Sequence, residues 1–300
     1  MLVVMYHYVR RDSAEYPNFN HLRVDDFERQ LDYFEKEYGF VTRAQFLSSF
    51  DTGKIPKGVL LTFDDGLSDH YENVYPILKK RGIFGIFYVP TGHYKNKQKK
   101  LLSVHRVHYL KGKYNSKNLL PEALSYISSD MLDQSKIHEF DMEIYKDQSQ
   151  SKSEYQLKRL FNYFLKPEHV EPILDILMKK YFKESELYDK IYLKVHQIKE
   201  MHDNGYLIGG HTENHNVLSR LGYLEQEREI MNSFSFLENI VGKLKVKSFC
   251  YPYGGKSSFN SDTVDILCRN DIHHSFMVGN EDVKDIKNRH FLKRMDCNRF

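Results

Sequence analysis

Two short segments of the chain hold the residues best suited to chemistry. Asp64 and Asp65 stand side by side, and His211 and His215 lie four residues apart much later in the chain. Two imidazoles and one carboxylate are a common ligand set of catalytic metal sites, which keep one position open for water or substrate. The second carboxylate is then left to transfer a proton. This combination indicates a metal-dependent hydrolase.

Each segment also has a plainer interpretation. An Asp-Asp-Gly sequence is often a turn with solvated carboxylates, and two histidines at this spacing are often surface residues. Gly209 and Gly210, just before His211, favour the functional interpretation because glycines let the backbone and a ligand approach closely. A zinc-peptidase motif would need Glu where the chain has Thr212. Non-haem iron also uses two histidines and one carboxylate, but the spare aspartate suits hydrolysis better.

The elements that must position these residues alternate between strand and helix, which predicts a parallel β/α architecture. The apolar run 59–63 ends on the two aspartates, as a buried strand that delivers side chains to its carboxyl end would. Further strands are predicted at residues 2–5, 84–89, 206–209 and 246–251 and near 275 and 291. Helices are predicted from Asp25, with an acidic cap, at 71–81, up to Asp203, and at 224–241 and 261–270.

A different pattern occupies the middle of the chain. From about residue 95 to residue 193 it is rich in Lys, Ser, Glu and Tyr, with amphipathic stretches and no convincing strand. We therefore predict a single domain over residues 1–300 that carries a mostly helical insertion at about 95–193. Inside it, Arg106 lies between His105 and His108. An ordinary polar helix face is the preferred interpretation, ahead of a second metal site or an anion site.

Composition limits the class of protein. The 44 basic and 41 acidic residues give a formal charge of +3, which is too small to indicate a nucleic-acid partner. The three cysteines are far apart, which predicts reduced thiols. No stretch approaches the ~20 apolar residues of a membrane span, and the start lacks the pattern of a signal peptide. We therefore expect a protein without a membrane span, cytoplasmic or, as the alternative, exported, and of undefined oligomeric state.

Three motifs together resemble those of the polysaccharide deacetylases, the NodB-like group of carbohydrate esterase family 4. Thr62 to Asp65 match T-F-D-D, His211 to His215 match H-[ST]-x-x-H, and Pro252 to Gly254 match a third motif that ends in P-Y-G. The resemblance covers roughly residues 1–93 and 195–300. It implies a distorted (β/α) barrel and a carbohydrate substrate, from whose N-acetylated or O-acetylated sugars the enzyme removes acetyl groups.

The same resemblance implies roles for the matched residues. Asp65, His211 and His215 would bind one divalent metal ion, with zinc the expected ion and cobalt, manganese, nickel and iron the alternatives. Asp64 would be the general base, and the backbone N–H of Tyr253 would be an oxyanion donor. A fixed N–H and a cation on one oxygen stabilise the charge that develops during amide cleavage.

The chain departs from the family pattern in two places. Cys250 stands where many members have an arginine that holds the base aspartate, and no histidine after Gly255 fits the late catalytic motif. The opening Met5 to Val9 resembles the M-Y-H-x-V start of a circularly permuted branch that includes the poly-N-acetylglucosamine deacetylases. In that branch the first strand supplies the histidine, so His7 is implied as the general acid. Arg294, near the end of the chain, is the candidate for the missing arginine.

Two other functions stay open from the sequence. The same site with a different substrate would make the chain a hydrolase of small cyclic amides. A barrel that has lost its activity would be a carbohydrate-binding protein, which the missing arginine and late histidine favour. Acetate release from defined oligosaccharides, with and without a chelator, separates these possibilities.

Overall fold

The computed structural model describes residues 1–133 and 151–300, which form two compact units. The first, here called the barrel unit, contains residues 1–11, 21–95 and 190–300. The second, here called the helical unit, contains residues 12–20 and the described part of 96–189. All residues to which the sequence gives a role in the reaction belong to the barrel unit.

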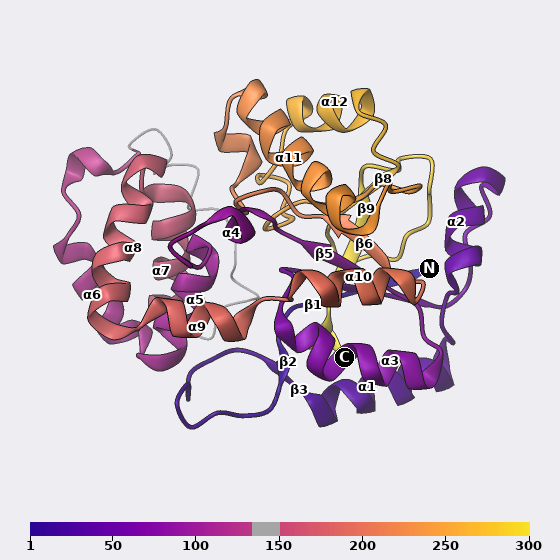
Figure 1. The fold of residues 1–300 in the computed structure, drawn as a ribbon, viewed down its shortest axis with the longest axis horizontal. Helices are drawn as coiled ribbons and strands as arrows, with labels where there is room; N and C mark the ends of the chain where they lie inside the picture. Colours follow the sequence, from indigo (N-terminus) through magenta and orange to yellow (C-terminus); the bar gives the residue numbers. More distant parts are fainter. Residues whose placement is uncertain (134–150) are drawn as a thin grey trace. The chain divides into compact units, whose positions relative to one another are not determined.

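Seven parallel strands close on themselves in the barrel unit (Figure 1). Around the barrel they are β1 (Leu2–Tyr6), β4 (Val59–Phe63), β5 (Gly85–Val89), β6 (Leu207–Gly210), β7 (Ser248–Cys250), β8 (His274–Val278) and β9 (Leu292–Asp296). The last strand, β9, pairs with β1 and so completes the ring. The predicted distorted (β/α) barrel is confirmed.

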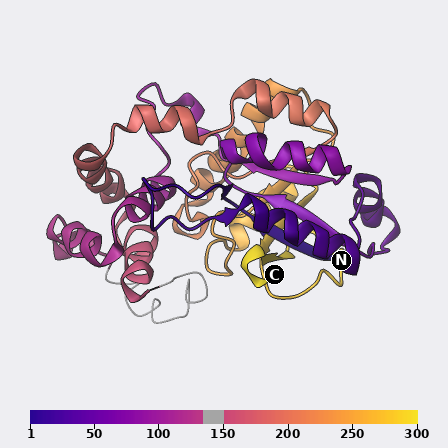
Figure 2. The same ribbon diagram turned by 90° about the horizontal axis from the view of Figure 1, so that it is seen from below.

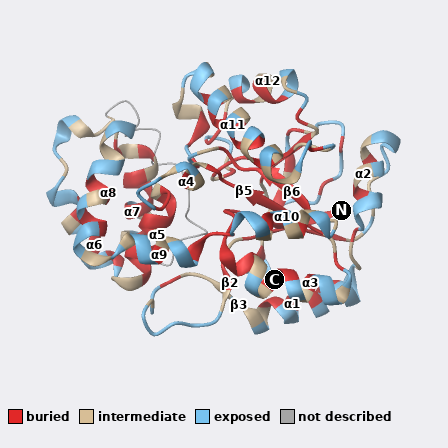
Figure 3. Cartoon of the chain, viewed as in Figure 1, coloured by how far each residue is buried: buried red, intermediate tan, exposed pale blue. Residues whose placement is uncertain are grey.

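Helices cover the outside of these strands (Figure 1). They are α1 (Val24–Glu37), α3 (Tyr75–Arg81), α10 (Val195–Asp203), α11 (Tyr223–Val241) and α12 (Ser261–Arg269). The views in Figures 1 and 2 show α1 and α3 side by side, where Arg81 Nη1 lies 2.5 Å from Asp32 Oδ1. The apolar stripe of α1 is buried against the strands, and Figure 3 shows the strands as the most continuously buried part of this unit.

Alternation along the strands decides which side chains enter the barrel. Successive strand residues point to opposite faces. On β4, Leu61 and Phe63 pack in the cluster that contains the helix residues, whereas Leu60 packs in a second cluster with residues of the other strands. Thr62 and Asp64 follow Leu60 at intervals of two, so both face the barrel interior. The carboxyl end of β4 thus delivers Asp64 inward.

Several details of the predicted elements are wrong. The first helix begins at Val24, its N-cap is Arg23 without a side-chain cap, and Asp25 lies in its first turn. There the carboxylate stabilises the helix dipole instead of capping the helix. The predicted helix 71–81 is a π-helical turn, η1 (His70–Val74), followed by α3, which ends at Gly82.

Further elements of the barrel unit have no counterpart among the predictions. These are the two-residue strands β2 (Val9–Arg10) and β3 (Leu22–Arg23) and the helix α2 (Arg43–Thr52). Thr42 begins α2 with a capping box, because its hydroxyl accepts the N–H of Gln45 while the Gln45 side chain accepts the N–H of Thr42. A single turn of helix, α4 (Gly92–Lys95), follows β5.

The helical unit consists of short helices. They are α5 (Ser103–Lys113), α6 (Ser116–Ser125), α7 (Lys152–Arg159), α8 (Pro167–Tyr181) and most of α9 (Glu184–Ile191), with the turns η2 (Ser129–Met131) and η6 (Leu160–Phe164). Residues 12–20, which lie outside the predicted insertion, fold with it: Phe19 packs on Tyr109, with ring centroids 4.9 Å apart. His105 and Arg106 are fully buried, so the polar face predicted for this stretch is wrong.

Among the helices of residues 1–133 and 151–300, none combines the length and the apolar character that crossing a bilayer requires.

Candidate active site

Three side chains from two distant segments meet at the carboxyl end of the barrel. Asp65 follows β4, while His211 and His215 lie in the loop after β6. Asp65 Oδ1 lies 3.5 Å from His211 Nε2 and 3.3 Å from His215 Nε2, and all three residues are buried. The loop between the histidines contains no helical turn, so a tight loop, rather than a helix, aims both imidazoles.

These three atoms fit a metal ion. A tetrahedral ion with bonds of about 2.0 to 2.1 Å to nitrogen and oxygen holds its ligand atoms about 3.3 to 3.4 Å apart. The three atoms of Asp65, His211 and His215 lie within 4.8 Å of one another. Two of the three distances, 3.5 Å and 3.3 Å, are close to the ligand-to-ligand distance of a tetrahedral ion. Three protein ligands leave one position of a tetrahedron open, as in catalytic zinc sites.

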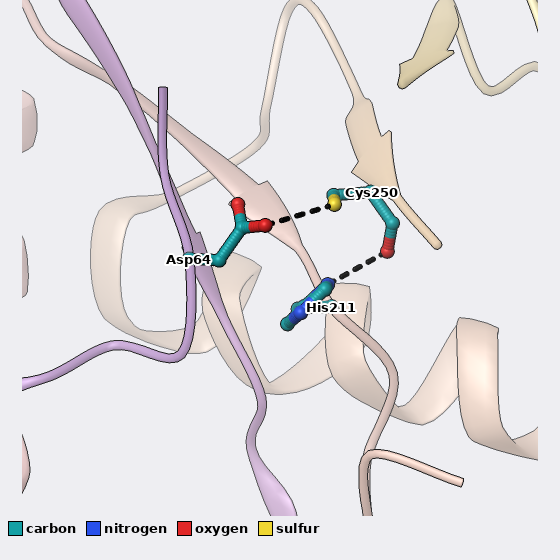
Figure 4. A group of neighbouring side chains, drawn as sticks. All are labelled: Asp64, His211 and Cys250. Carbon is teal, nitrogen blue, oxygen red and sulfur yellow. Dashed lines mark hydrogen bonds between the residues drawn. The ribbon is translucent and has the colours of Figure 1, made fainter. Parts of the chain in front are cut away.

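A second contact fixes the orientation of His211. Its Nδ1 lies 2.7 Å from the carbonyl oxygen of Cys250 at the end of β7, as Figure 4 shows. Since a carbonyl can only accept, Nδ1 carries the proton and donates it. Nε2 is thereby turned toward Asp65, and it is the nitrogen that would bind an ion once its proton is displaced.

The neighbouring Asp64 is held by a different group. Arg294 Nη1 donates to Asp64 Oδ1 and Nη2 to Oδ2, each at 2.7 Å, and both residues are buried. Nη1 also donates to the Thr62 hydroxyl at 3.1 Å. Burial alone would raise the pKa of Asp64, but the charge and hydrogen bonds of Arg294 lower it to about 2. Asp64 is therefore a carboxylate at neutral pH, and a bidentate pair fixes its orientation.

Asp64 also forms a second grouping with His211 and Cys250 (Figure 4). Cys250 Sγ lies 3.5 Å from Asp64 Oδ2, but Arg294 Nη2 lies 2.8 Å from the same sulfur. Burial raises the pKa of the Cys250 thiol, so the sulfur is neutral. A guanidinium cation between a thiol and a carboxylate leaves no place for another cation, so this grouping does not fit a metal ion.

His7 also lies near the Asp64 carboxylate. It follows β1, its Nε2 is 3.9 Å from Asp64 Oδ2, and 38% of its side chain is exposed. A hydrogen bond fixes the backbone of His7, since His70 Nε2 lies 2.9 Å from its carbonyl oxygen. Burial lowers the pKa of His70, which favours the neutral imidazole as donor in this contact.

The late histidines of the chain lie in other surroundings. His274 Nε2 is 2.7 Å from the Ser248 hydroxyl, and its Nδ1 is 2.9 Å from His273 Nδ1. His290 Nδ1 is 3.1 Å from the hydroxyl of Ser275. Burial lowers the pKa of all three imidazoles, so they are neutral at pH 7.

Unusual backbone conformations concentrate at this site. Six non-glycine residues among those described have a positive φ. Four of them belong to the site: Asp65 (79°), Thr212 (63°), His215 (59°) and Tyr253 (63°). Such conformations cost about 1–3 kcal/mol each and cluster at functional sites, where the surroundings hold them in place. The ring of Tyr253 packs on that of His215, with centroids 4.9 Å apart, which brings this loop beside the ligands.

Two features of the site differ from the sequence interpretation or were missed by it. A Cβ on Gly209 would lie 2.4 Å from the Tyr88 ring and 2.7 Å from the Ser248 carbonyl oxygen, so this glycine lets strands pack rather than a ligand approach. Glu229 of α11 accepts hydrogen bonds from the histidine loop. No spacing in the sequence connects it with the ligands.

A family model described as polysaccharide deacetylase matches residues 52–125 and 160–278. These ranges are more than half of the 300 residues and contain Asp64, Asp65, His211, His215 and Tyr253. The chain belongs to the polysaccharide deacetylase family. The resemblance seen in the three motifs is thus confirmed. His7 and Arg294 lie outside the matched ranges, His7 directly after the first strand of the barrel and Arg294 on the last.

A curated relative agrees with this membership over part of the chain. The poly-beta-1,6-N-acetyl-D-glucosamine N-deacetylase of Staphylococcus aureus strain N315 is 34% identical over 106 residues. The alignment covers 31% of this chain and 36% of the relative, so the chain matches only about a third of the relative's length.

Solved structures share the fold over nearly the whole chain. The Streptococcus pyogenes deacetylase PplD in complex with acetate has a TM-score of 0.59 at 20% identity, covering 99% of this chain and 91% of that one. IcaB from Ammonifex degensii has a TM-score of 0.57 at 20% identity, with coverage of 98% and 90%. At this identity, the likeness supports the family's barrel fold.

Proposed function

We propose that this protein is a metal-dependent carbohydrate deacetylase that removes acetyl groups from N-acetylated sugars. One arrangement carries the proposal: the ligand atoms of Asp65, His211 and His215 converge, while Arg294 holds the adjacent Asp64 as a carboxylate. Ligand and base roles thus fall to two neighbouring aspartates in different surroundings. Family membership supports the same reaction class.

The ligand residues would hold one divalent ion, for which zinc suits two imidazole nitrogens and one carboxylate oxygen. When bound, such an ion lowers the pKa of water toward neutrality and polarises the acetyl carbonyl.

The other residues would move protons and stabilise charge. Asp64 accepts a proton as water attacks the acetyl carbonyl carbon, and the Tyr253 N–H donates to the oxyanion that forms. His7 Nε2 then donates a proton to the sugar nitrogen, the C–N bond breaks, and acetate and a free amine leave. His7 and Asp64 can serve the same substrate because their side chains are 3.9 Å apart.

The substrate class follows from chemistry and from the named relatives. The Staphylococcus aureus relative is named for poly-beta-1,6-N-acetyl-D-glucosamine, and the PplD structure contains acetate, the product of deacetylation. We therefore propose N-acetylglucosamine-containing glycans as substrates, in a polysaccharide or a glycoconjugate, with O-acetylated sugars as the alternative class.

Acetate release coupled to metal analysis tests the proposal. The purified protein is incubated with N-acetylglucosamine oligomers after chelation and after addition of Zn²⁺ or Co²⁺. We expect about one ion per chain, acetate release that chelation abolishes, and recovery on adding the ion. Glycan binding without acetate release under any metal condition would identify a binding protein instead. Turnover of cyclic imides alone would move the function to small cyclic amides.

A further inference from the structure

We propose that Glu229 is a positioning residue that holds the loop between the two ligand histidines and thereby sets the affinity of the site for its ion. Glu229 lies on α11, and its side chain is buried. The inference deepens the proposed function and rests on it. Glu229 acts on the ligands through the loop, and it is not itself a candidate ligand.

The contacts of Glu229 fall on the residues that flank His215. Its Oε2 accepts the backbone N–H of Asn214 at 2.7 Å. Its Oε1 accepts the Asn214 side-chain amide at 2.7 Å and the Asn216 side-chain amide at 3.2 Å. One carboxylate therefore ties the residue before His215 and the residue after it to the same point on α11.

A carboxylate satisfies all three donors at once. It offers two acceptor oxygens with about four lone-pair sites, whereas a glutamine of the same shape has one acceptor oxygen and an NH₂ group that donates. In Glu229→Gln the new side-chain NH₂ group would face N–H donors of the loop that a carboxylate oxygen accepts in the wild type. Burial raises the pKa of Glu229, so a charge kept here must be stabilised by its loop partners.

The loop needs such support because its conformation is strained. Thr212 and His215 both have positive φ, which non-glycine residues adopt rarely. The Thr212 hydroxyl accepts the His215 N–H at 3.0 Å. These internal features shape the loop, but they do not fix its place against the barrel.

Two segments fix that place, from different elements. At the end of β5, Thr91 N–H donates to the Thr212 carbonyl at 3.2 Å and Gly92 N–H donates to the Glu213 carbonyl at 2.6 Å. The approach is so close that a Cβ on Gly92 would lie 2.3 Å from Asn214 Oδ1. Glu229 supplies a second anchor, on α11. The side chain of Glu213 is also held, by Lys95 and by Asn232 of α11, so removing Glu229 releases Asn214 and Asn216 on either side of His215 while Glu213 stays attached.

Measurement of metal affinity tests the inference without relying on turnover. The dissociation constant for Zn²⁺ is measured by competition with a chromophoric chelator for the wild type and Glu229→Gln. We expect an affinity loss of about 10- to 100-fold, the usual effect of removing a group that orients a metal ligand. At saturating Zn²⁺ the variant should regain kcat with KM unchanged. Glu229→Asp, which keeps the charge on a shorter side chain, should restore part of the affinity.

Glu238→Gln is the matched control. Glu238 lies on the same helix and also accepts a backbone N–H from a loop, that of Leu244 at 3.2 Å. The chemical change is identical, but the contact is remote from the ligands. We expect wild-type affinity for Zn²⁺, so a loss in Glu229→Gln alone assigns the effect to the histidine loop.

The outcomes separate the two proposals. If the wild type binds no ion, the proposed function fails. If the wild type binds Zn²⁺ and Glu229→Gln binds it equally well, only the positioning role is overturned. Should Glu229→Gln fail to fold, Asn214→Ala and Asn216→Ala each remove one donor to the same carboxylate. We expect a larger loss of Zn²⁺ affinity for Asn214→Ala, whose contact is shorter, and unchanged affinity in both would overturn the inference.

Discussion

Among the residues that the structure describes, two arginines are fully buried, one in each unit, and they bind carboxylates in different ways. Arg294 of the barrel unit faces one carboxylate, Asp64, which is also buried. Arg106 of the helical unit contacts three, with side chains 52%, 42% and 16% exposed: Glu171, Asp175 and Glu184. Arg294 therefore forms a buried pair with one carboxylate, whereas Arg106 belongs to a partly solvated network of three carboxylates.

The difference separates a structural role from a functional one. Arg106, on α5, joins residues of α8 and α9, so its contacts cross-link three helices while its carboxylate partners keep part of their solvent exposure. A fully buried pair is often no more stabilising than well-packed apolar residues. The Arg294–Asp64 pair is better explained by chemistry, because it keeps one carboxylate ionised and oriented beside the ligand triad.

Replacing Asp64 by Asn should have the largest effect on turnover. The amide keeps the shape of the side chain but cannot accept a proton, so we expect kcat to fall about 10³- to 10⁴-fold. Asp65, His211 and His215 are untouched, so the metal content should stay at the wild-type level. Acetate release and metal analysis on the same preparation check both parts. Loss of the ion would show that the two aspartates share the ligand role.

Replacing Arg294 by Met should have the second-largest effect on turnover. Asp64 would remain buried without a cation, so we expect turnover to fall by about 10²-fold or more as the base loses its orientation. Breaking a buried pair from one side costs about 3–5 kcal/mol of stability. Acetate release and thermal unfolding measure the two effects. Normal turnover would remove Arg294 from the site.

The same variant should change the pH dependence. In the wild type Arg294 lowers the pKa of Asp64 to about 2, below the unfolded value. Stabilisation by the pair is therefore complete above about pH 4 and is lost as the pH falls toward 2. In Arg294→Met burial is opposed only by the weaker effects of His211 and His7, so the pKa of Asp64 rises and the acid limb of kcat/KM should move to higher pH. An unmoved acid limb would assign that limb to another group.

Replacing His7 by Ala should lower turnover about 10²-fold, the usual scale for loss of a general acid. Its side chain is partly exposed and follows β1, so stability should change little. On a sugar whose leaving group needs no proton, the variant should lose less activity than it loses on the natural amide. Wild-type rates on both substrates would remove His7 from the acid role.

The convergence of Asp65, His211 and His215 could be predicted from the sequence because each signal is local. A buried apolar strand runs directly into Asp64 and Asp65, and another buried strand runs directly into His211, so in both places the strand and the polar residues after it are adjacent in the sequence. The Arg294–Asp64 contact spans 230 residues and depends on β9 closing against β1, so its geometry has no local signal. The contacts of Glu229 depend on how α11 packs against the loop.

The missed elements have a similar physical explanation. The helix α2 buries only Phe46 and Ser49, which leaves no apolar stripe for periodicity to detect. The segment 12–20 joins the helical unit through a few contacts, such as Phe19 on Gly112. Such contacts are set by packing between distant residues, and neither segment has a repeating pattern.

Replacing Arg106 by Met should have the smallest effect on turnover and so gives the sharpest test of the comparison. Its carboxylate partners can take up water, and Asp175 keeps Lys100 at 2.7 Å, so we expect a stability loss of about 1–3 kcal/mol. Zn²⁺ affinity and the acid limb of kcat/KM should match the wild type, in contrast to Arg294→Met. Thermal unfolding, metal titration and a pH–rate profile measure these three quantities. A shifted acid limb would mean that Arg106 tunes the chemistry as well, and the two arginines would no longer differ in role.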